Sequence, residues 1–260
     1  MKIDAQFKEQ TLKKIRRLTD AYAAGLLGGE IMPEDANPGL DAGCLENHIY
    51  FSLPMALNYQ RNSYTLWASA LATYQDADTR CVFSPEAVVL IDEELLRAKL
   101  LKHKLALQPN KHIQIWKTLC NTIYSEWGGD IRALFQANDR DVIKIKAYMA
   151  ANKKSYPFLS GTKILNYWLY VMSRYTDLAL TNKQAISIAP DTHIIQATEK
   201  LGLMAYISPK EQNSREAVAE VWEELLSETE FAPIDIHTPL WLWNRSGAKF
   251  DIDSMDDDEG

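Results

Sequence analysis

One stretch of the chain decides the expected fold, and it reads Tyr156-Pro157-Phe158-Leu159-Ser160-Gly161-Thr162-Lys163-Ile164-Leu165-Asn166-Tyr167-Trp168. The pattern predicts two helices joined by a tight turn at Gly161. Backbone N–H groups at such a turn, and at the start of the following helix, favour an anion because they are unpaired and lie at the positive end of the helix dipole. We therefore expect Gly161 and Thr162 to bind a phosphate, with Lys163 close by.

A second segment, Pro190-Asp191-Thr192-His193, places an aspartate where a helix is expected to begin. Aspartate is a favoured N-cap, because its carboxylate accepts hydrogen bonds from the N–H groups of the first turn. Two interpretations follow. Asp191 stabilises the helix alone, or the same carboxylate is held in position for catalysis.

The rest of the chain predicts further helices. The spacing of apolar residues and the capping signals favour helices over 2–27, in two parts over 49–75 with a break at 58–62, from Ser84-Pro85 to about 107, over 111–127, in two short pieces over 130–150, and from Asn213 to about 228. Gly28-Gly29 and Gly128-Gly129 are expected helix ends. Strict period-two alternation is hard to find, so we expect an all-α fold.

Composition limits the class of protein. The 260 residues are 47% hydrophobic and 24% charged, which is typical of globular chains. No apolar run of about 18 residues and no signal pattern is present, so we expect a cytoplasmic protein without a membrane partner. The three cysteines lie far apart and the histidines lack metal-ligand spacing, so we expect no iron–sulfur cluster, no other metal and no cofactor.

The net charge of −7 argues against a nucleic-acid partner. Six of the acidic residues, however, lie between 251 and 259, and without them the charge is −7 + 6 = −1. We expect residues 248–260 to form a disordered acidic tail. A nearly neutral body can still carry one basic face.

Leu159-Ser160-Gly161-Thr162-Lys163 followed by Pro190-Asp191-Thr192-His193 resembles the helix-hairpin-helix DNA glycosylases, such as endonuclease III, in which a Leu-Pro-Gly-x-Gly hairpin and a lysine precede Val-Asp-Thr-His. The chain is also similar to the archaeal 8-oxoguanine glycosylase family (AGOG). The similar segments are Lys163–Tyr167, Ser173-Arg174, Ile188–Asp191 and Pro233–Leu242.

The resemblance implies a two-lobed helix-hairpin-helix glycosylase-like fold. Residues 45–189 would form the helical lobe with the hairpin, while residues 1–44 and 190–247 would form the second lobe. It also implies a function, the excision of a damaged purine such as 8-oxoguanine from duplex DNA in base excision repair. A damaged nucleotide is flipped out of the duplex, because its glycosidic bond is inaccessible in the stack.

Residue roles follow from the same resemblance. Asp191 is the catalytic aspartate, and Lys163 stands near the position of the lysine that forms a Schiff base in lyase members. An alternative alignment, with AGOG, puts that nucleophile at Tyr156, with Lys153 and Lys154 beside it. Trp67 and Trp241 match tryptophans that line the base pocket, and His237 replaces an aspartate that reads the base.

Two other functions stay open from the sequence. A non-catalytic nucleic-acid-binding protein would use the hairpin only to grip the backbone. An N-glycosidase acting on a free modified nucleoside or nucleotide would need no duplex, which suits the acidic net charge.

Overall fold

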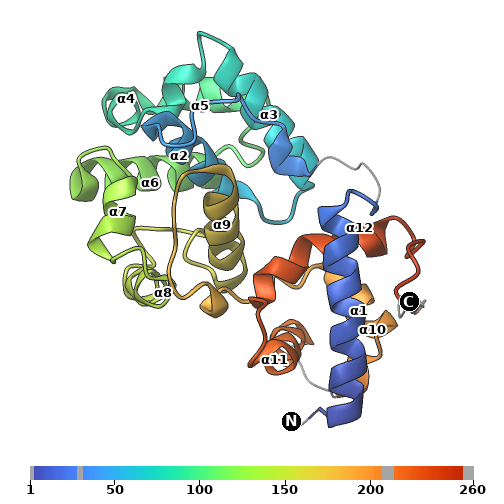
Figure 1. Cartoon of the computed structure of the whole chain (residues 1–260). Helices are drawn as coiled ribbons and strands as arrows, with labels where there is room; N and C mark the ends of the chain where they lie inside the picture. The colour runs from blue at the N-terminus through green and yellow to red at the C-terminus, as the bar shows by residue number, and fades with distance from the viewer. Residues whose placement is uncertain (1–2, 28–31, 207–213, 254–260) are drawn as a thin grey trace. The chain divides into compact units, whose positions relative to one another are not determined.

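A computed structural model of the chain describes residues 3–27, 32–206 and 214–253 (Figure 1). They divide into two compact units. Unit 1 is made of Met1–Glu30 and Gln184–Gly260, and unit 2 is made of Ile31–Lys183. The chain therefore begins unit 1, forms all of unit 2 and returns to unit 1.

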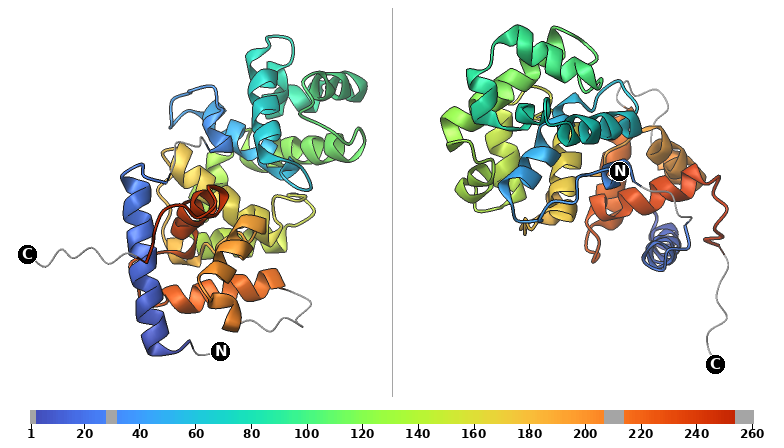
Figure 2. Two further views of the ribbon diagram at one scale, coloured as in Figure 1. Left: turned by 90° about the vertical axis from the view of Figure 1, so that its right-hand side faces the viewer. Right: turned by 90° about the horizontal axis from the view of Figure 1, so that it is seen from above.

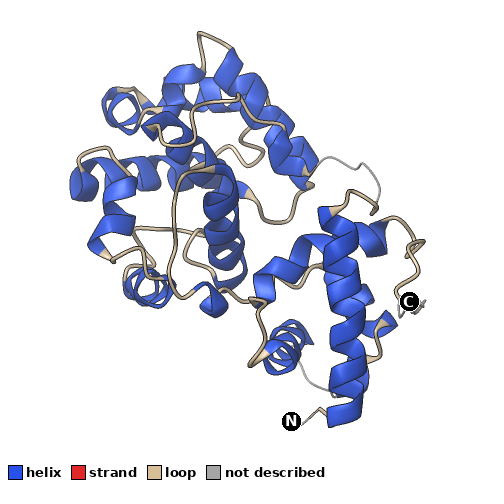
Figure 3. Cartoon of the chain, viewed as in Figure 1, coloured by secondary structure: helices blue, strands red, loops and turns tan. Residues whose placement is uncertain are grey.

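Both units are built from helices, and the described residues contain no strand (Figure 3). The β-type contact among them is an isolated bridge between Asp141 and Thr181. The expectation of an all-α fold is confirmed for this part of the chain.

Unit 2 packs its helices around buried aromatic side chains. Trp116 and Trp168 are fully buried, and their indole N–H groups donate to Val82 O at 2.9 Å and to Ser52 Oγ at 3.1 Å. In this unit α2 packs against α9, and α4 against α6 (Figures 1 and 2). Its elements are η1 (Pro33–Asp35), α2 (Leu45–Ser52), η2 (Pro54–Leu57), α3 (Ser63–Gln75), η3 (Arg80–Phe83), α4 (Pro85–Leu90), α5 (Glu93–Lys102), α6 (Lys111–Trp127), α7 (Arg132–Ala137), α8 (Val142–Ala151) and α9 (Thr162–Tyr175).

In unit 1, α12 (His237–Arg245) packs against both α10 (Thr192–Lys200) and α1 (Ala5–Ala23). α11 (Ser214–Leu226) packs against α1 and α10, and its Trp222 donates to Thr198 Oγ1 at 2.9 Å. The short turns η5 (Leu203–Tyr206) and η6 (Pro233–Ile236) complete the unit, while η4 (Lys183–Ala185) lies at its junction with unit 2.

Several helix ends agree with the sequence predictions. Ser84 Oγ accepts the N–H of Ala87 at 3.2 Å where α4 begins, and α6 ends at Gly128, whose φ is +62°. Residues 58–62 separate η2 from α3. Gly28-Gly29 and Asn213 lie outside the described residues, and α1 ends earlier, at Ala23.

The single helix expected from Ser84 to about 107 is wrong. α4 ends at Leu90, and α5 begins after Asp92. The Asp92 carboxylate accepts the N–H groups of Glu94 and Leu95 at 2.9 and 3.4 Å. An aspartate that caps a new helix competes with continuation of the previous one, which explains the break.

The unit boundaries differ from the expected lobes. Residues 31–44 lie in unit 2, where the Tyr50 hydroxyl donates to Ala36 O at 3.1 Å and the Asp177 N–H donates to Ala42 O at 3.2 Å. Residues 184–189 belong to unit 1 instead of the unit that holds α8 and α9.

The first part of the expected tail is packed. Trp243 donates to Phe250 O at 2.9 Å, and Arg17 Nε donates to Asp251 O at 3.0 Å. Ile252 is only 8% exposed. Residues 248–253 are therefore part of the folded unit 1, while residues 254–260 lie outside the described residues.

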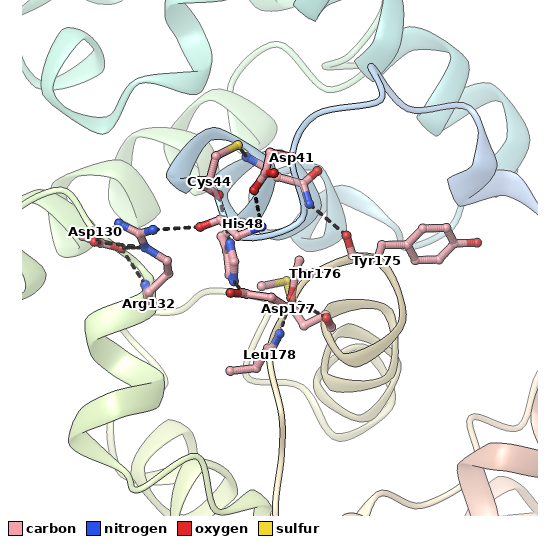
Figure 4. A network of polar contacts seen from close by, with 12 residues as sticks. Asp41, Cys44, His48, Asp130, Arg132, Tyr175, Thr176, Asp177 and Leu178 are labelled. Carbon is pink, nitrogen blue, oxygen red and sulfur yellow. Dashed lines mark hydrogen bonds and ion pairs between the residues drawn. The ribbon is translucent and has the colours of Figure 1, made fainter.

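A buried histidine and a neighbouring arginine join three segments of unit 2 (Figure 4). His48 Nδ1 lies 2.9 Å from Cys44 O, and its Nε2 lies 3.3 Å from Asp177 Oδ1. Both oxygens are hydrogen-bond acceptors that face nitrogens of the ring. Beside it, Arg132 donates to Gly43 O at 2.9 Å. The network ties the start of α2 to the start of α7 and to the chain that leaves α9.

We expect His48→Phe to lower the free energy of unfolding by ~2 kcal/mol, because it keeps an aromatic ring and removes both polar contacts. Asp177→Ala should cost less, because that side chain is 64% exposed. Urea unfolding of the single and double variants measures both effects and their coupling. A parent-like midpoint for His48→Phe would contradict this role.

Candidate functional site

Asp191 is the N-cap of α10, as the sequence predicts. Its Oδ1 accepts the backbone N–H of Ile194 at 3.0 Å, and its Oδ2 accepts the indole N–H of Trp241 at 3.2 Å. The second donor comes from α12, 50 positions further along the chain. A carboxylate with a donor on each oxygen has a fixed orientation. Asp191 is also half-buried, so the carboxylate is not sealed inside unit 1.

Polar side chains of α10 and α12 surround Trp241, which is 8% exposed. The Arg245 guanidinium lies 4.7 Å from the centre of the indole ring, and the His193 ring meets it edge-on at 5.3 Å. Asn244 Nδ2 lies 3.0 Å from His193 Nδ1. We call these residues, with Asp191, the aspartate cluster. Because Arg245 covers one face of Trp241, at most the opposite face is available to a flat ligand.

His237 is the first residue of α12 and is buried. It precedes Trp241 by four positions, so the two residues share one face of the helix. Unit 1 thus contains three of the residues that the sequence predicts for the site: Asp191, Trp241 and His237.

α8 and α9 follow one another at the expected positions, but the segment between them differs from the predicted tight turn. Residues 152–161 join the helices, which is longer than a tight turn. Gly161 has φ −68°, whereas Phe158 adopts the left-handed φ of +62°. Gly161 is needed for space instead, since a Cβ there would lie 3.1 Å from Phe158 O. The special backbone conformation is therefore at Phe158.

The start of α9 keeps the features of an anion site. Thr162 and Lys163 are exposed in the first turn, and no side chain caps this end of the helix. The first N–H groups of a helix have no partner within the helix, so an anion can receive them. The geometry is compatible with the phosphate contact expected at Gly161 and Thr162.

The two predicted catalytic residues belong to different units, Lys163 to unit 2 and Asp191 to unit 1. A Schiff-base lysine reacts as the neutral amine, which burial favours, and Lys163 is exposed. Tyr156, the alternative position, is buried and its hydroxyl accepts the Trp127 N–H at 2.7 Å. Burial raises the pKa of Tyr156 above its ordinary value.

Trp67 lies in the core of unit 2 with no exposed surface. Its ring centre is 5.8 Å from that of Tyr50 and 5.6 Å from that of Phe51. The ring packs against these aromatic neighbours. A contact between Trp67 and a base therefore stays a prediction from the resemblance.

Glu34 is a candidate that the sequence analysis misses. It lies in η1 and is 1% exposed. Burial raises the pKa of its carboxyl to about 7, and hydrogen bonding by its own backbone, by the Tyr167 hydroxyl and by Trp67 opposes this. The Trp67 N–H is close enough to act on that pKa, yet neither it nor Glu34 Oε1 makes a hydrogen bond of good geometry with a described residue. A glutamate after a proline in a loop normally lies in solvent, so only the tertiary structure reveals it.

No group of His, Cys, Asp and Glu side chains in the described residues is arranged to hold a metal ion. The thiols of Cys44, Cys81 and Cys120 are not disulfide-bonded, and burial raises the pKa of Cys120. Among the described helices, none combines the length and the apolar character needed to cross a bilayer.

The chain matches no known protein family, and no curated protein is significantly similar to it.

Glu34→Gln should change how stability depends on pH. The ordinary pKa of this carboxyl is 4.5 and its folded value is about 7, so between these values the folded state keeps a proton that the unfolded state releases. Stability then falls as pH rises through this window, by ~3 kcal/mol in total. Glutamine does not titrate, so the variant should gain about that much relative to the parent at pH 8 but not at pH 4.

Urea unfolding between pH 4 and 8.5 measures the difference. Glu86→Gln, exposed on α4, is the matched control and should keep the parent's pH profile. Parallel profiles for the parent and Glu34→Gln would show that Glu34 is not a buried, titrating group.

Proposed function

We propose that the chain is a DNA N-glycosylase that removes a damaged base from duplex DNA, with Asp191 as its catalytic carboxylate and 8-oxoguanine as the first candidate base. One observation carries the proposal, the 3.2 Å contact between Asp191 and Trp241. The resemblance assigns catalysis and base contact to these two positions. Helix capping alone would require the Ile194 contact and not a second donor from another helix.

The chemistry requires a fixed anionic group. As the glycosidic bond breaks, positive charge develops on the sugar, and a carboxylate nearby stabilises it or takes a proton from the attacking water. The hydroxyl of that water bonds to C1′, and a proton goes to the leaving base. The N–H groups of Ile194 and Trp241 hold the Asp191 carboxylate in one orientation, so it needs little reorganisation during the reaction.

Two features of unit 2 support a nucleic-acid substrate. The exposed, uncapped start of α9 suits a backbone phosphate. The Glu34 carboxyl, whose pKa is raised to about 7 by burial, can donate a hydrogen bond when protonated and accept one in either form, and it lies near Trp67. That pairing suits an adjacent N–H and C=O, as on the edge of guanine, 8-oxoguanine or uracil.

Base release by water is the primary step in this proposal. Lys163 is exposed, whereas the neutral amine that forms a Schiff base is favoured by burial. AP-lyase activity through a Schiff base at Lys163 is the secondary activity to be tested.

Asp191→Asn should slow base release by at least about 100-fold, because asparagine keeps the helix cap but has no charge. The substrates are duplex oligonucleotides that carry 8-oxoguanine or uracil, with base release followed under single-turnover conditions. Asp141→Asn is the matched control, since Asp141 is also an N-cap and accepts the N–H groups of Ile143 and Lys144. Equal rates for Asp191→Asn and Asp141→Asn would remove the catalytic role.

Borohydride trapping on an abasic-site duplex tests the lyase activity. We expect base release in the first assay and no covalent adduct here, because the amine of Lys163 is exposed. An adduct that forms with the parent and disappears in Lys163→Gln would show instead that this lysine is a Schiff-base nucleophile.

The same assays separate the other two functions. Duplex binding without base release would indicate a non-catalytic binding protein. Release from free nucleosides without duplex binding would indicate a nucleoside-directed glycosidase.

A further inference from the structure

Three buried polar atoms on neighbouring residues of unit 2 have no hydrogen-bond partner among the described residues. They are Tyr59 Oη, Arg61 Nε and His112 Nε2, and we call these residues the donor cluster. The Tyr59 and His112 rings meet edge-on with centres 5.5 Å apart, and the positive charge of Arg61 acts on His112. His112 is 2% exposed, so its unpaired nitrogen lies within the protein. Buried polar groups are normally paired, and each exception calls for an explanation.

The available hydrogens make this a cluster of donors. His112 Nδ1 accepts the Leu107 N–H at 3.1 Å, which leaves the proton of the neutral ring on Nε2. Burial, with Arg61 and Lys111, lowers the pKa of His112 to about 4, so the ring is neutral at pH 7. Arg61 gives its terminal N–H groups to Leu105 O and Lys104 O, and its Nε–H remains. The missing partner is therefore an acceptor.

Three segments meet at the donor cluster, residues 58–62, 104–112 and 153–163. Arg61 joins the first to the second through its two carbonyl contacts, and the stacked rings of Tyr59 and Phe158, 4.0 Å apart, join the first to the third. The segments contain no Asp or Glu, although the chain carries a net charge of −7. Their basic residues are Arg61, Lys104, Lys111, Lys153, Lys154 and Lys163.

The junction is also strained. Phe158 has φ +62°, a conformation that costs about 1–2 kcal/mol for a residue with a Cβ. The Lys111 ammonium lies 5.0 Å from the centre of the Tyr59 ring and 4.5 Å from that of Phe158. Tyr59 and Arg61 are half-buried and Lys111 is exposed, so the cluster lies just beneath the surface. Strain of this kind is typical of functional sites.

We propose that the donor cluster receives a phosphodiester oxygen of bound nucleic acid, with the ammonium of Lys111 beside it. A phosphate oxygen supplies the missing acceptor and the negative charge that this surface lacks. Tyr59, Arg61 and His112 belong neither to the aspartate cluster nor to α9. The phosphate contact rests on the proposed function only in taking nucleic acid as the partner.

Tyr59→Phe is the sharpest test, because it removes one unpaired hydroxyl and keeps both ring contacts. Its binding to an undamaged duplex should weaken roughly tenfold, since a hydrogen bond to a charged oxygen is lost. Its thermal stability should be equal to or higher than the parent's, because a buried hydroxyl without a partner is removed. Tyr124→Phe, partly exposed elsewhere on α6, is the control and should bind like the parent.

Lys111→Gln gives an independent readout. The slope of log binding constant against log salt should fall by about one, as for the loss of one phosphate contact. Lys13→Gln, an exposed lysine of α1 paired with Glu9, should keep the parent slope. Fluorescence anisotropy of the full chain with a labelled duplex measures all four variants.

Undamaged duplex contains no substrate, so these results do not depend on whether the chain releases a base. Parent-like binding by Tyr59→Phe would overturn the phosphate site even if base release is observed. If Tyr59→Phe weakens binding to polyglutamate as much as it weakens binding to the duplex, the surface binds negative charge in general and not a phosphodiester. That result would also overturn the phosphate site. A tenfold loss confined to nucleic acid supports the site even if no base is released.

Discussion

A buried indole N–H needs an acceptor, and meeting this requirement organises both units. Six of the seven tryptophans donate to oxygens of other segments, and in doing so they join helix to loop and helix to helix. An all-α core has no sheet edges that offer free carbonyls, so these acceptors come from side chains and from loop backbone. One of these acceptors is the Asp191 carboxylate. The hydrogen bond that pairs the buried Trp241 N–H therefore also orients the candidate catalytic group.

Trp67 is the one tryptophan whose indole N–H has no acceptor among the described residues. It is as buried as Trp116 and Trp168, yet its N–H completes no hydrogen bond, although Glu34 is near. An unsatisfied N–H beside an unsatisfied carboxyl oxygen is an exception to the usual pairing of buried polar groups. The donor cluster repeats the pattern elsewhere in unit 2.

Local signals in the sequence predict local structure. Ser84, Gly128 and Asp191 act through atoms within a few residues of themselves, and the helix ends they mark are found. The break at Asp92 could have been found by the same reasoning. Contacts between distant segments could not: the Trp241 donor to Asp191 and the burial of Glu34 depend on packing that no spacing records. Between α8 and α9, the sequence predicted the turn at Gly161 because glycine favours turns. The left-handed conformation is instead at Phe158, whose ring stacks on Tyr59.

The discontinuity of unit 1 has a consequence for synthesis on the ribosome. α1 is translated before its partners α11 and α12, which follow only after all of unit 2. At the usual elongation rates, its apolar face, with Ile15 and Leu18, waits on the order of 10–40 s for α12. Unit 2 is continuous and can fold in that interval. Until α12 has been made, the nascent chain therefore holds α1 without the helices that cover its apolar face.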